Sequence, residues 1–364
     1  MLYFAFIYLV IILGYIPVKA NIINKKIYCI FVGVTLFLIL GLRHPLVGQG
    51  DTYNVYLSNF TDIYLGGISV AFNQDKDILF QLATYFFGET FELNTHLYVF
   101  IFSLPSIYFV TKLIYLYSKM PMLSFIVFSS LHFYGFAFSA MRQINAMALL
   151  LLSYTFFKKK KYFKFFLCIV IASLFHQVAI VFAIVPIFQF IFERFKINKI
   201  YLFMFPVLGL ISSLLLKDWL RNFINVIASI EDRYTHMVEQ NQTTNLTSFF
   251  IYLVILIFSF ITLKNKGQDR SLLLLLIITS IGTFFAPMSL VAREFGRVAY
   301  CFSIFNILLI PRVVSTIHSG KLRFLTILFL VIIFSLYFFN NMIENMELIP
   351  YVPYWETYPN YIFN

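Results

Sequence analysis

Long apolar runs recur along nearly the whole chain, and they constrain its fold more than any other feature. A helix needs ~20 apolar residues to cross a bilayer, and a spanning segment must satisfy its backbone hydrogen bonds internally. Only 12% of the residues are charged and 61% are hydrophobic, against about 25% charged in an average soluble chain. We count twelve candidate spans, at 1–17, 27–43, 95–114, 121–137, 143–157, 162–176, 178–192, 200–216, 247–263, 271–287, 297–312 and 324–340.

These runs predict an all-α, polytopic integral membrane protein with about 12 transmembrane helices, forming a single multi-spanning domain over residues 1–364. They exclude a soluble enzyme, a disordered chain and a disulfide-rich secreted module. The three cysteines are solitary within apolar runs and have no metal-ligand spacing, so no metal site is expected.

The distribution of basic residues predicts the orientation. If the N-terminus is extracytoplasmic, the inner loops hold 19 of the 27 basic residues but only Glu193 and Asp269 of the 16 acidic ones. Cytoplasmic loops collect Lys and Arg, so this assignment is favoured and both termini are expected outside. The same rule explains the net charge of +11 without a nucleic-acid partner. The inner basic residues are Lys19, Lys25, Lys26, Lys112, Lys119, Lys158 to Lys161, Lys164, Arg194, Lys196, Lys199, Lys264, Lys266, Arg270, Arg312, Lys321 and Arg323.

Two extracytoplasmic segments are too long to be simple turns: residues 44–94 and residues 217–246. Connections of this length usually have a function. Residues 77–91 are apolar but short, and a full span there would reverse the charge asymmetry of every later loop. We therefore expect a short helix that lies in the outer interface or re-enters the membrane. The chain has no GxxxxGK[ST] nucleotide-binding motif.

The first outer loop carries candidate ligand-binding residues. Arg43 lies at its start, followed by Asp51, Tyr53 and Tyr56, and glycines such as Gly48 allow tight turns and a close approach of the backbone to a ligand. A base, an acid and aromatic rings at one membrane surface suit a phosphorylated, sugar-bearing ligand. The alternative is a solvated loop in which Arg43 reaches the lipid headgroups.

Three further arginines lie on the outer side, where the charge rule does not place them. Arg142 lies at the outer end of a span, and an intramembrane arginine usually faces a cavity or a partner. Arg293 and Arg297 are four residues apart, so a helix would place both guanidinium groups on one face, able to bind a diphosphate. Glu294 could neutralise one of them, and Arg142 could instead reach the headgroups.

His176 ends the sixth predicted span and is a candidate general base, because imidazole titrates near neutral pH. Asp51 and Asp77 are rival carboxylate bases. A packed, hydrogen-bonded histidine is the alternative interpretation. The aromatic tail at 351–361 suits an interfacial belt or a surface on which sugars stack.

Four motifs follow one another along the chain: Arg43…Val47-Gly48…Asp51-Thr52-Tyr53…Tyr56, Met141-Arg142-Gln143-Ile144 followed by Lys158 to Lys161 and Ala172-Ser-Leu-Phe175-His176, Gly296-Arg297-Val-Ala-Tyr300 leading to Pro311, and Pro350-Tyr-Val-Pro353-Tyr354. Taken in order, these motifs resemble the EpsG family of Wzy-type bacterial polysaccharide polymerases. The sequence departs from the family pattern in two places: Gln49 and Gly50 are additional, and Asp77 replaces an expected Glu.

The resemblance implies a metal-independent glycosyltransferase without a cofactor, in the bacterial cytoplasmic membrane. It would join undecaprenyl-diphosphate-linked oligosaccharides into O-antigen, capsule or exopolysaccharide at the outer face, in contact with membrane lipid. A chain-length regulator and a flippase of the same pathway are expected partners. The alternatives are a lipid-linked oligosaccharide flippase or transporter, and another membrane glycosyltransferase or ligase.

For such a reaction we expect fixed arginines to stabilise the charge that develops on the leaving diphosphate. Arg142 and Arg297 are the expected diphosphate ligands, with Arg43 and Arg293 supporting them. Asp51 or His176 is the expected base. The residues expected to orient sugar or lipid phosphate are Tyr53, Tyr56 and Tyr300.

Overall fold

The computed structural model describes residues 1–48, 51–74, 76–219, 222, 246–263, 269–344 and 347–357. These residues are helical apart from connections and one isolated antiparallel bridge between Arg43 and Pro353. Most of the predicted second outer loop, 217–246, lies outside the described residues. The chain divides into two compact units, Met1–Ile180 with Ser319–Asn364 (unit 1) and Val181–His318 (unit 2).

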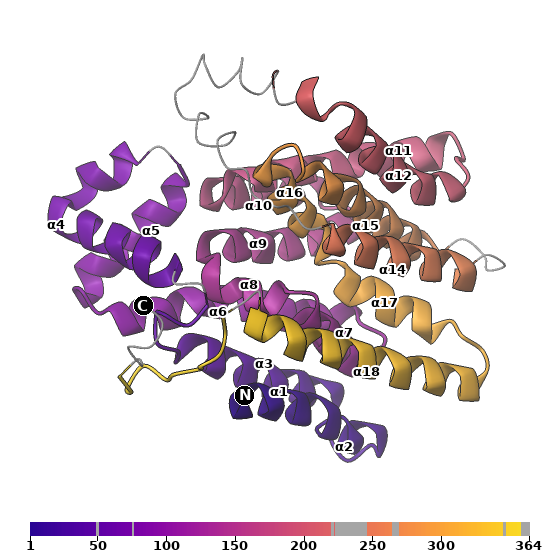
Figure 1. Cartoon of the computed structure of the whole chain (residues 1–364), viewed down its shortest axis with the longest axis horizontal. Coiled ribbons are helices and arrows are strands. Elements are labelled where there is room, and N and C mark those ends of the chain that lie inside the picture. The colour runs from indigo at the N-terminus through magenta and orange to yellow at the C-terminus, as the bar shows by residue number, and fades with distance from the viewer. Residues whose placement is uncertain are drawn as a thin grey trace. The chain divides into compact units, whose positions relative to one another are not determined.

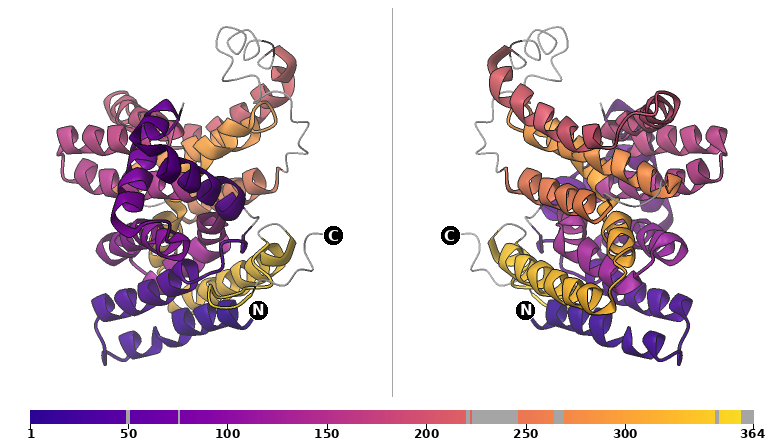
Figure 2. Two further views of the ribbon diagram at one scale, coloured as in Figure 1. Left: turned by 90° about the vertical axis from the view of Figure 1, so that its left-hand side faces the viewer. Right: turned by 90° about the vertical axis from the view of Figure 1, so that its right-hand side faces the viewer.

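Unit 1 contains eleven described α-helices and a short π-helix, η1. Its contacts join consecutive helices, such as α9 and α10, and also helices that are separated along the chain, such as α6 with α3 and with α9. The last helix, α18, packs against α7 (Figures 1 and 2), and its Phe338 and Phe339 lie beside the Tyr8 ring of α1. The elements are α1 (Leu2–Leu13), α2 (Ile16–Lys19), α3 (Lys25–Gly41), η1 (Thr52–Leu57), α4 (Ser58–Asn73), α5 (Ile78–Phe91), α6 (Thr95–Tyr117), α7 (Pro121–Ser130), α8 (Phe133–Ser139), α9 (Met141–Lys158), α10 (Tyr162–Phe175) and α18 (Gly320–Glu344).

The predicted loop 44–94 is mostly helical. After η1, α4 and α5 form a hairpin, and the segment that was expected to form a short helix at 77–91 is α5. Gly67 has φ = 73°, which kinks α4 in the middle. The hairpin buries an aromatic core against α6, in which Phe60 stacks on Tyr98 with ring centroids 4.6 Å apart. Aromatic pairs of this kind add stability beyond their buried area.

Unit 2 is built around α15, whose residues are almost all buried. A helix that is apolar all round belongs in a core, and α15 packs against α11, α12, α14, α16 and α17. The Ser280 hydroxyl of α15 donates to the Leu202 carbonyl of α12. The elements are η2 (Gln177–Ile184), which begins at the end of unit 1, α11 (Val185–Arg194), α12 (Ile200–Leu215), α14 (Thr247–Leu263), α15 (Arg270–Met288), α16 (Arg293–Ser303) and α17 (Asn306–Ser315).

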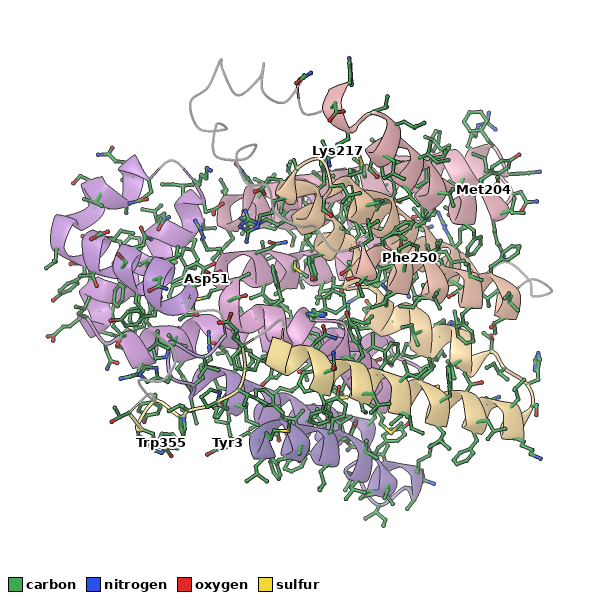
Figure 3. The ribbon with its side chains drawn as sticks, in the orientation of Figure 1. Tyr3, Asp51, Met204, Lys217, Phe250 and Trp355 are labelled. Atoms are coloured by element: carbon green, nitrogen blue, oxygen red, sulfur yellow. The ribbon has the colours of Figure 1, made fainter. Side chains whose placement is uncertain are left out.

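All twelve predicted apolar runs coincide with helices, but a count of twelve spans is not confirmed. Among the described residues, five helices are long and apolar enough to cross a membrane, or up to seven if each of two bent pairs is one span. The bent pairs are α7 with α8 (48°) and α16 with α17 (43°). Apolar side chains such as Met204 and Phe250 are 56% and 52% exposed on their helices (Figure 3), as lipid-facing residues are.

Candidate functional site

Asp77 is the centre of a polar cluster in unit 1. Its side chain is 3% exposed, and its backbone is left-handed, with φ = 60° and ψ = 44°. Asp77 precedes α5 but makes no side-chain cap to that helix, although Asp is a favoured cap residue. Its carboxylate is turned instead toward α9 and α10. A non-glycine residue held in this conformation is strained, and such strain collects at functional sites.

Arg142 approaches this carboxylate from the first turn of α9. Its Nη1 lies 3.0 Å from Asp77 Oδ2, and its guanidinium carbon lies 5.5 Å from the centre of the Tyr56 ring. Burial raises the pKa of the Tyr56 hydroxyl, against the opposing effects of the positive charge of Arg142 and of a hydrogen bond from it. The Arg142 side chain remains 27% exposed. Because a guanidinium has five N–H donors, Arg142 can bind Asp77 and still offer donors to a ligand.

His176 completes the cluster where α10 ends. It has an extended backbone (φ = −160°, ψ = 115°), and its Nδ1 lies 3.5 Å from Asp77 Oδ2. The break in the helix also frees the Gln177 N–H, which donates to Asp77 Oδ1 over 3.3 Å. Within the described part of the chain, His176 Nε2 is buried without a hydrogen-bond partner. A carboxylate beside one imidazole nitrogen and a second nitrogen with its hydrogen-bonding position unused is the arrangement of an oriented general base.

The Asp77 cluster (Asp77, Arg142, His176 and Tyr56) is fixed by the residues beside it in sequence. Met141, which precedes Arg142, lies in the aromatic core of the α4–α5 hairpin, and Phe175, which precedes His176, packs against the same core. Tyr56 and Phe80 belong to this core as well. Rigid packing of this kind holds a reactive geometry better than a loop alone.

Arg43 has different surroundings from Arg142. It is 1% exposed and its guanidinium donates to Leu40 O, Ser103 Oγ, Thr52 Oγ1 and Phe138 O. The Arg43 guanidinium carbon also lies 5.1 Å from the centre of the Phe138 ring. A guanidinium with this many protein acceptors fixes the start of the first outer loop, so Arg43 is a positioning residue and we do not include it among the ligands of the substrate.

Asp51 immediately precedes η1, and Tyr53 is the second residue of this π-helix. Asp51 precedes the π-helix without capping it by its side chain, and Tyr53 is 52% exposed. Of the two carboxylates predicted as rival bases, Asp77 has a described contact with His176. Sequence reasoning did not pair Asp77 with Arg142 and His176, because the three residues lie on separate helices between 34 and 99 positions apart.

The arginines predicted around residue 295, Arg293 and Arg297, lie in unit 2. Both lie in α16 one turn apart, which agrees with the expected shared face. Arg297 Nη1 pairs with Glu294 Oε1 over 2.9 Å, the neutralising contact that the sequence suggested for Glu294. Arg293 is exposed. Tyr300 follows one turn later and is half-buried.

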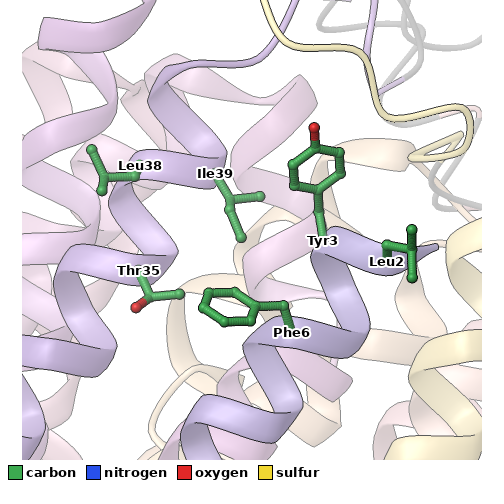
Figure 4. Close-up of a pocket in the computed structure, with 6 residues that line it drawn as sticks. All are labelled: Leu2, Tyr3, Phe6, Thr35, Leu38 and Ile39. Carbon is green, nitrogen blue, oxygen red and sulfur yellow. The ribbon is translucent and has the colours of Figure 1, made fainter.

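A second feature of unit 1 is an apolar groove of about 380 Å³ between α1 and α3. Tyr3 and Phe6 face Thr35 and Ile39 across it (Figure 4). It has no charged lining residue and is unsuited to a diphosphate. Within the described residues, no group of three or more His, Cys, Asp or Glu is arranged to hold a metal ion.

One of the three comparisons with known proteins found a match, and that match is to a family model. A search of the curated proteins and a search of the solved structures each found no significant match. The family model described as "EpsG family" matches residues 26–354, a range that includes every residue of the Asp77 cluster. The chain therefore belongs to the EpsG family, a family of Wzy-type polysaccharide polymerases.

Proposed function

We propose that this chain is a glycosyltransferase that joins undecaprenyl-diphosphate-linked oligosaccharide repeat units into a surface polysaccharide at the outer face of the cytoplasmic membrane. Family membership supports polysaccharide polymerisation. The outer face is supported by the charge asymmetry, because Tyr56, Asp77, Arg142 and His176 all fall in segments that the basic-residue count assigns to that side.

The observation that carries the proposal is the bridging carboxylate of Asp77. One oxygen lies 3.0 Å from Arg142 and 3.5 Å from His176 Nδ1, which leaves His176 Nε2 to accept a proton. Arg142 offsets the negative charge of Asp77, which would be costly to bury alone. The cluster therefore places a cation, which can bind phosphate, close to a base, which can activate a hydroxyl.

The reaction follows from these two groups. A hydroxyl of the acceptor sugar attacks the anomeric carbon of the donor glycan, and its proton passes to His176 Nε2. The glycosidic bond forms as the bond between the anomeric carbon and the diphosphate oxygen breaks. Arg142 stabilises the negative charge that the departing lipid diphosphate gains. The N-terminus of α9, where Arg142 lies, adds a favourable dipole for this anion.

The test is complementation of a deletion strain with single variants, read as the length distribution of the surface glycan. Arg142→Ala, His176→Gln and Asp77→Asn are each expected to remove the polymer ladder and leave single repeats. Losing one preorganised donor costs roughly 10²–10³-fold in rate, and losing a general base costs about 10²–10⁴-fold. Membrane levels of each variant are measured in the same cells.

Matched controls exist for two of these changes. Asp62 is an exposed acid on α4, and His318 is an exposed histidine in unit 2. Asp62→Asn and His318→Gln should give wild-type ladders. Normal ladders from both Arg142→Ala and His176→Gln would refute the proposed site. A deletion strain that still makes long lipid-linked polymer would indicate a ligase, and one with repeats trapped on the inner face would indicate a flippase.

A further inference from the structure

A polar pocket of about 530 Å³ opens on the first outer loop of unit 1. Its volume lies in the range of small-molecule sites, about 300–1,000 Å³. The lining comes from three segments: the start of the loop, η1 with the beginning of α4, and the start of α6. Among the lining residues are His44, Tyr53, Asn54, Ser58, Thr61 and His96.

The lining has many hydrogen-bonding groups and no acid, lysine or arginine. Hydroxyl, amide and imidazole groups both donate and accept, which suits a ligand with many hydroxyl groups. Burial and the neighbouring His96 lower the pKa of His44, and His44 Nδ1 accepts from the Leu46 N–H over 3.3 Å. The Tyr53 ring, 52% exposed, offers an apolar face on which a sugar ring can stack.

The π-helix η1 connects this pocket with the Asp77 cluster. Thr52 and Tyr56 are buried, where Thr52 Oγ1 donates to Phe138 O and Tyr56 contacts Arg142. Tyr53 and Asn54 face the pocket instead. One short element therefore contributes Tyr56 to the Asp77 cluster and presents Tyr53 and Asn54 to the pocket. π-Helical turns occur frequently at functional sites.

We propose that this pocket binds the uncharged saccharide of the acceptor, at the end whose hydroxyl is glycosylated. This inference rests on the proposed function, because the acceptor role follows from the assignment of the donor diphosphate to Arg142. An uncharged lining matches a sugar that arrives without a phosphate beside it, whereas the donor needs a cation at its leaving group. Tyr53 and Asn54 are the residues whose side chains contact the sugar.

The experiment measures binding of the repeat-unit oligosaccharide, freed from its lipid diphosphate by mild acid, to the full chain in nanodiscs. Tyr53→Ala and Asn54→Ala are expected to raise its Kd about tenfold, the loss that follows from removing one or two polar or stacking contacts. Val55→Ala is the matched control, because Val55 is 45% exposed on the same π-helix but does not line the pocket. It should bind as the wild type does.

The outcomes separate the two proposals. Arg142→Ala should bind the free oligosaccharide within about twofold of wild type while making no polymer. If Tyr53→Ala and Asn54→Ala bind normally, or if the wild type does not bind the free oligosaccharide, the saccharide pocket is refuted and the Asp77 site is unaffected. If Arg142→Ala still makes polymer while the pocket variants lose binding, the pocket stands and the proposed Asp77 site falls.

Discussion

Arg43 and Arg142 are both basic side chains at helix ends in unit 1, but their surroundings give them different tasks. Arg43 is enclosed by carbonyl and hydroxyl acceptors, whereas Arg142 shares Asp77 with His176 and keeps a quarter of its side chain exposed. A buried cation whose donors are bound by protein holds the fold. A cation with exposed donors can bind a ligand.

This difference predicts distinct effects of removing each arginine. Arg43→Ala should lower protein level and the thermal unfolding midpoint in detergent, because it leaves a cavity and removes the donor of buried acceptors such as Leu40 O, at about 1–3 kcal/mol per unsatisfied group. Arg142→Lys keeps a positive charge beside the buried Asp77 carboxylate, so this variant should keep the protein level near wild type and, without the guanidinium, lose the polymer. Equal losses of protein for the two variants would contradict the division of tasks.

Gly48 gives a second prediction for a single residue. Its φ is 93°, and a Cβ built there would lie 2.5 Å from the Cβ of Phe138. Gly48→Ala therefore combines backbone strain with overpacking, each costing about 1–3 kcal/mol. The unfolding midpoint should fall clearly. Gly320→Ala is the control, because nothing lies within 4 Å of a Cβ there, and a fall of the same size in that variant would contradict the steric explanation.

At the scale of elements, the end of α3 is completed by a segment 300 residues later in the chain. The last carbonyls of a helix have no partner within it. Here Leu40 O accepts from Arg43, Ile39 O from the Tyr351 hydroxyl over 2.8 Å, and Leu42 O from the Tyr354 N–H over 2.9 Å. The tail and the first outer loop are therefore joined in unit 1.

Removing one of these hydrogen bonds tests the contact between the end of α3 and the C-terminal tail. Tyr351→Phe keeps the ring contacts with Tyr3 and Phe4 but leaves Ile39 O without its hydroxyl donor. We expect a loss of about 1 kcal/mol in the free energy of unfolding. Tyr354→Phe serves as the control, because the described side-chain contacts of Tyr354 are those of its ring with His96 and Trp355, which the change retains. Equal effects of both changes would argue against the Tyr351 bond.

For the whole molecule, described ion pairs join residues that the charge count places on the same side of the membrane. In unit 2, Arg270 pairs with Glu193 over 2.8 Å, and Arg312 pairs with Asp269. All four belong to the predicted cytoplasmic side. In unit 1, the members of the Asp77 cluster all belong to the predicted outer side. A wrong orientation of one span would have separated such partners by the width of the bilayer.

Cysteine labelling in whole cells tests this orientation. The native Cys29, Cys168 and Cys301 are buried, so background reaction with an impermeant thiol reagent should be low. Ser69→Cys, on the exposed surface of α4, should react in intact cells, and Lys160→Cys should react only after the membrane is permeabilised. The reverse pattern would invert the topology and remove the proposed active site from the outer face.

The sequence by itself determined the helical class, the positions of the apolar segments and the family, because length, hydropathy and motif order are local properties of the chain. It also located Arg142 and His176 at the ends of predicted spans. It gave twelve candidate spans, whereas the described residues contain five helices, or up to seven, that are long and apolar enough to cross a membrane, because the hydropathy of a run does not reveal where its helix ends or bends.

Only the tertiary structure decided which of these polar groups meet. The packing of α5 on α10 and of α10 on α9 brings together Asp77, Arg142 and His176. The spacing of these residues along the chain does not predict that packing. The same applies to Arg43, whose acceptors come from four separate segments. Contacts between residues far apart in sequence depend on how side chains fill space, which apolar periodicity does not encode.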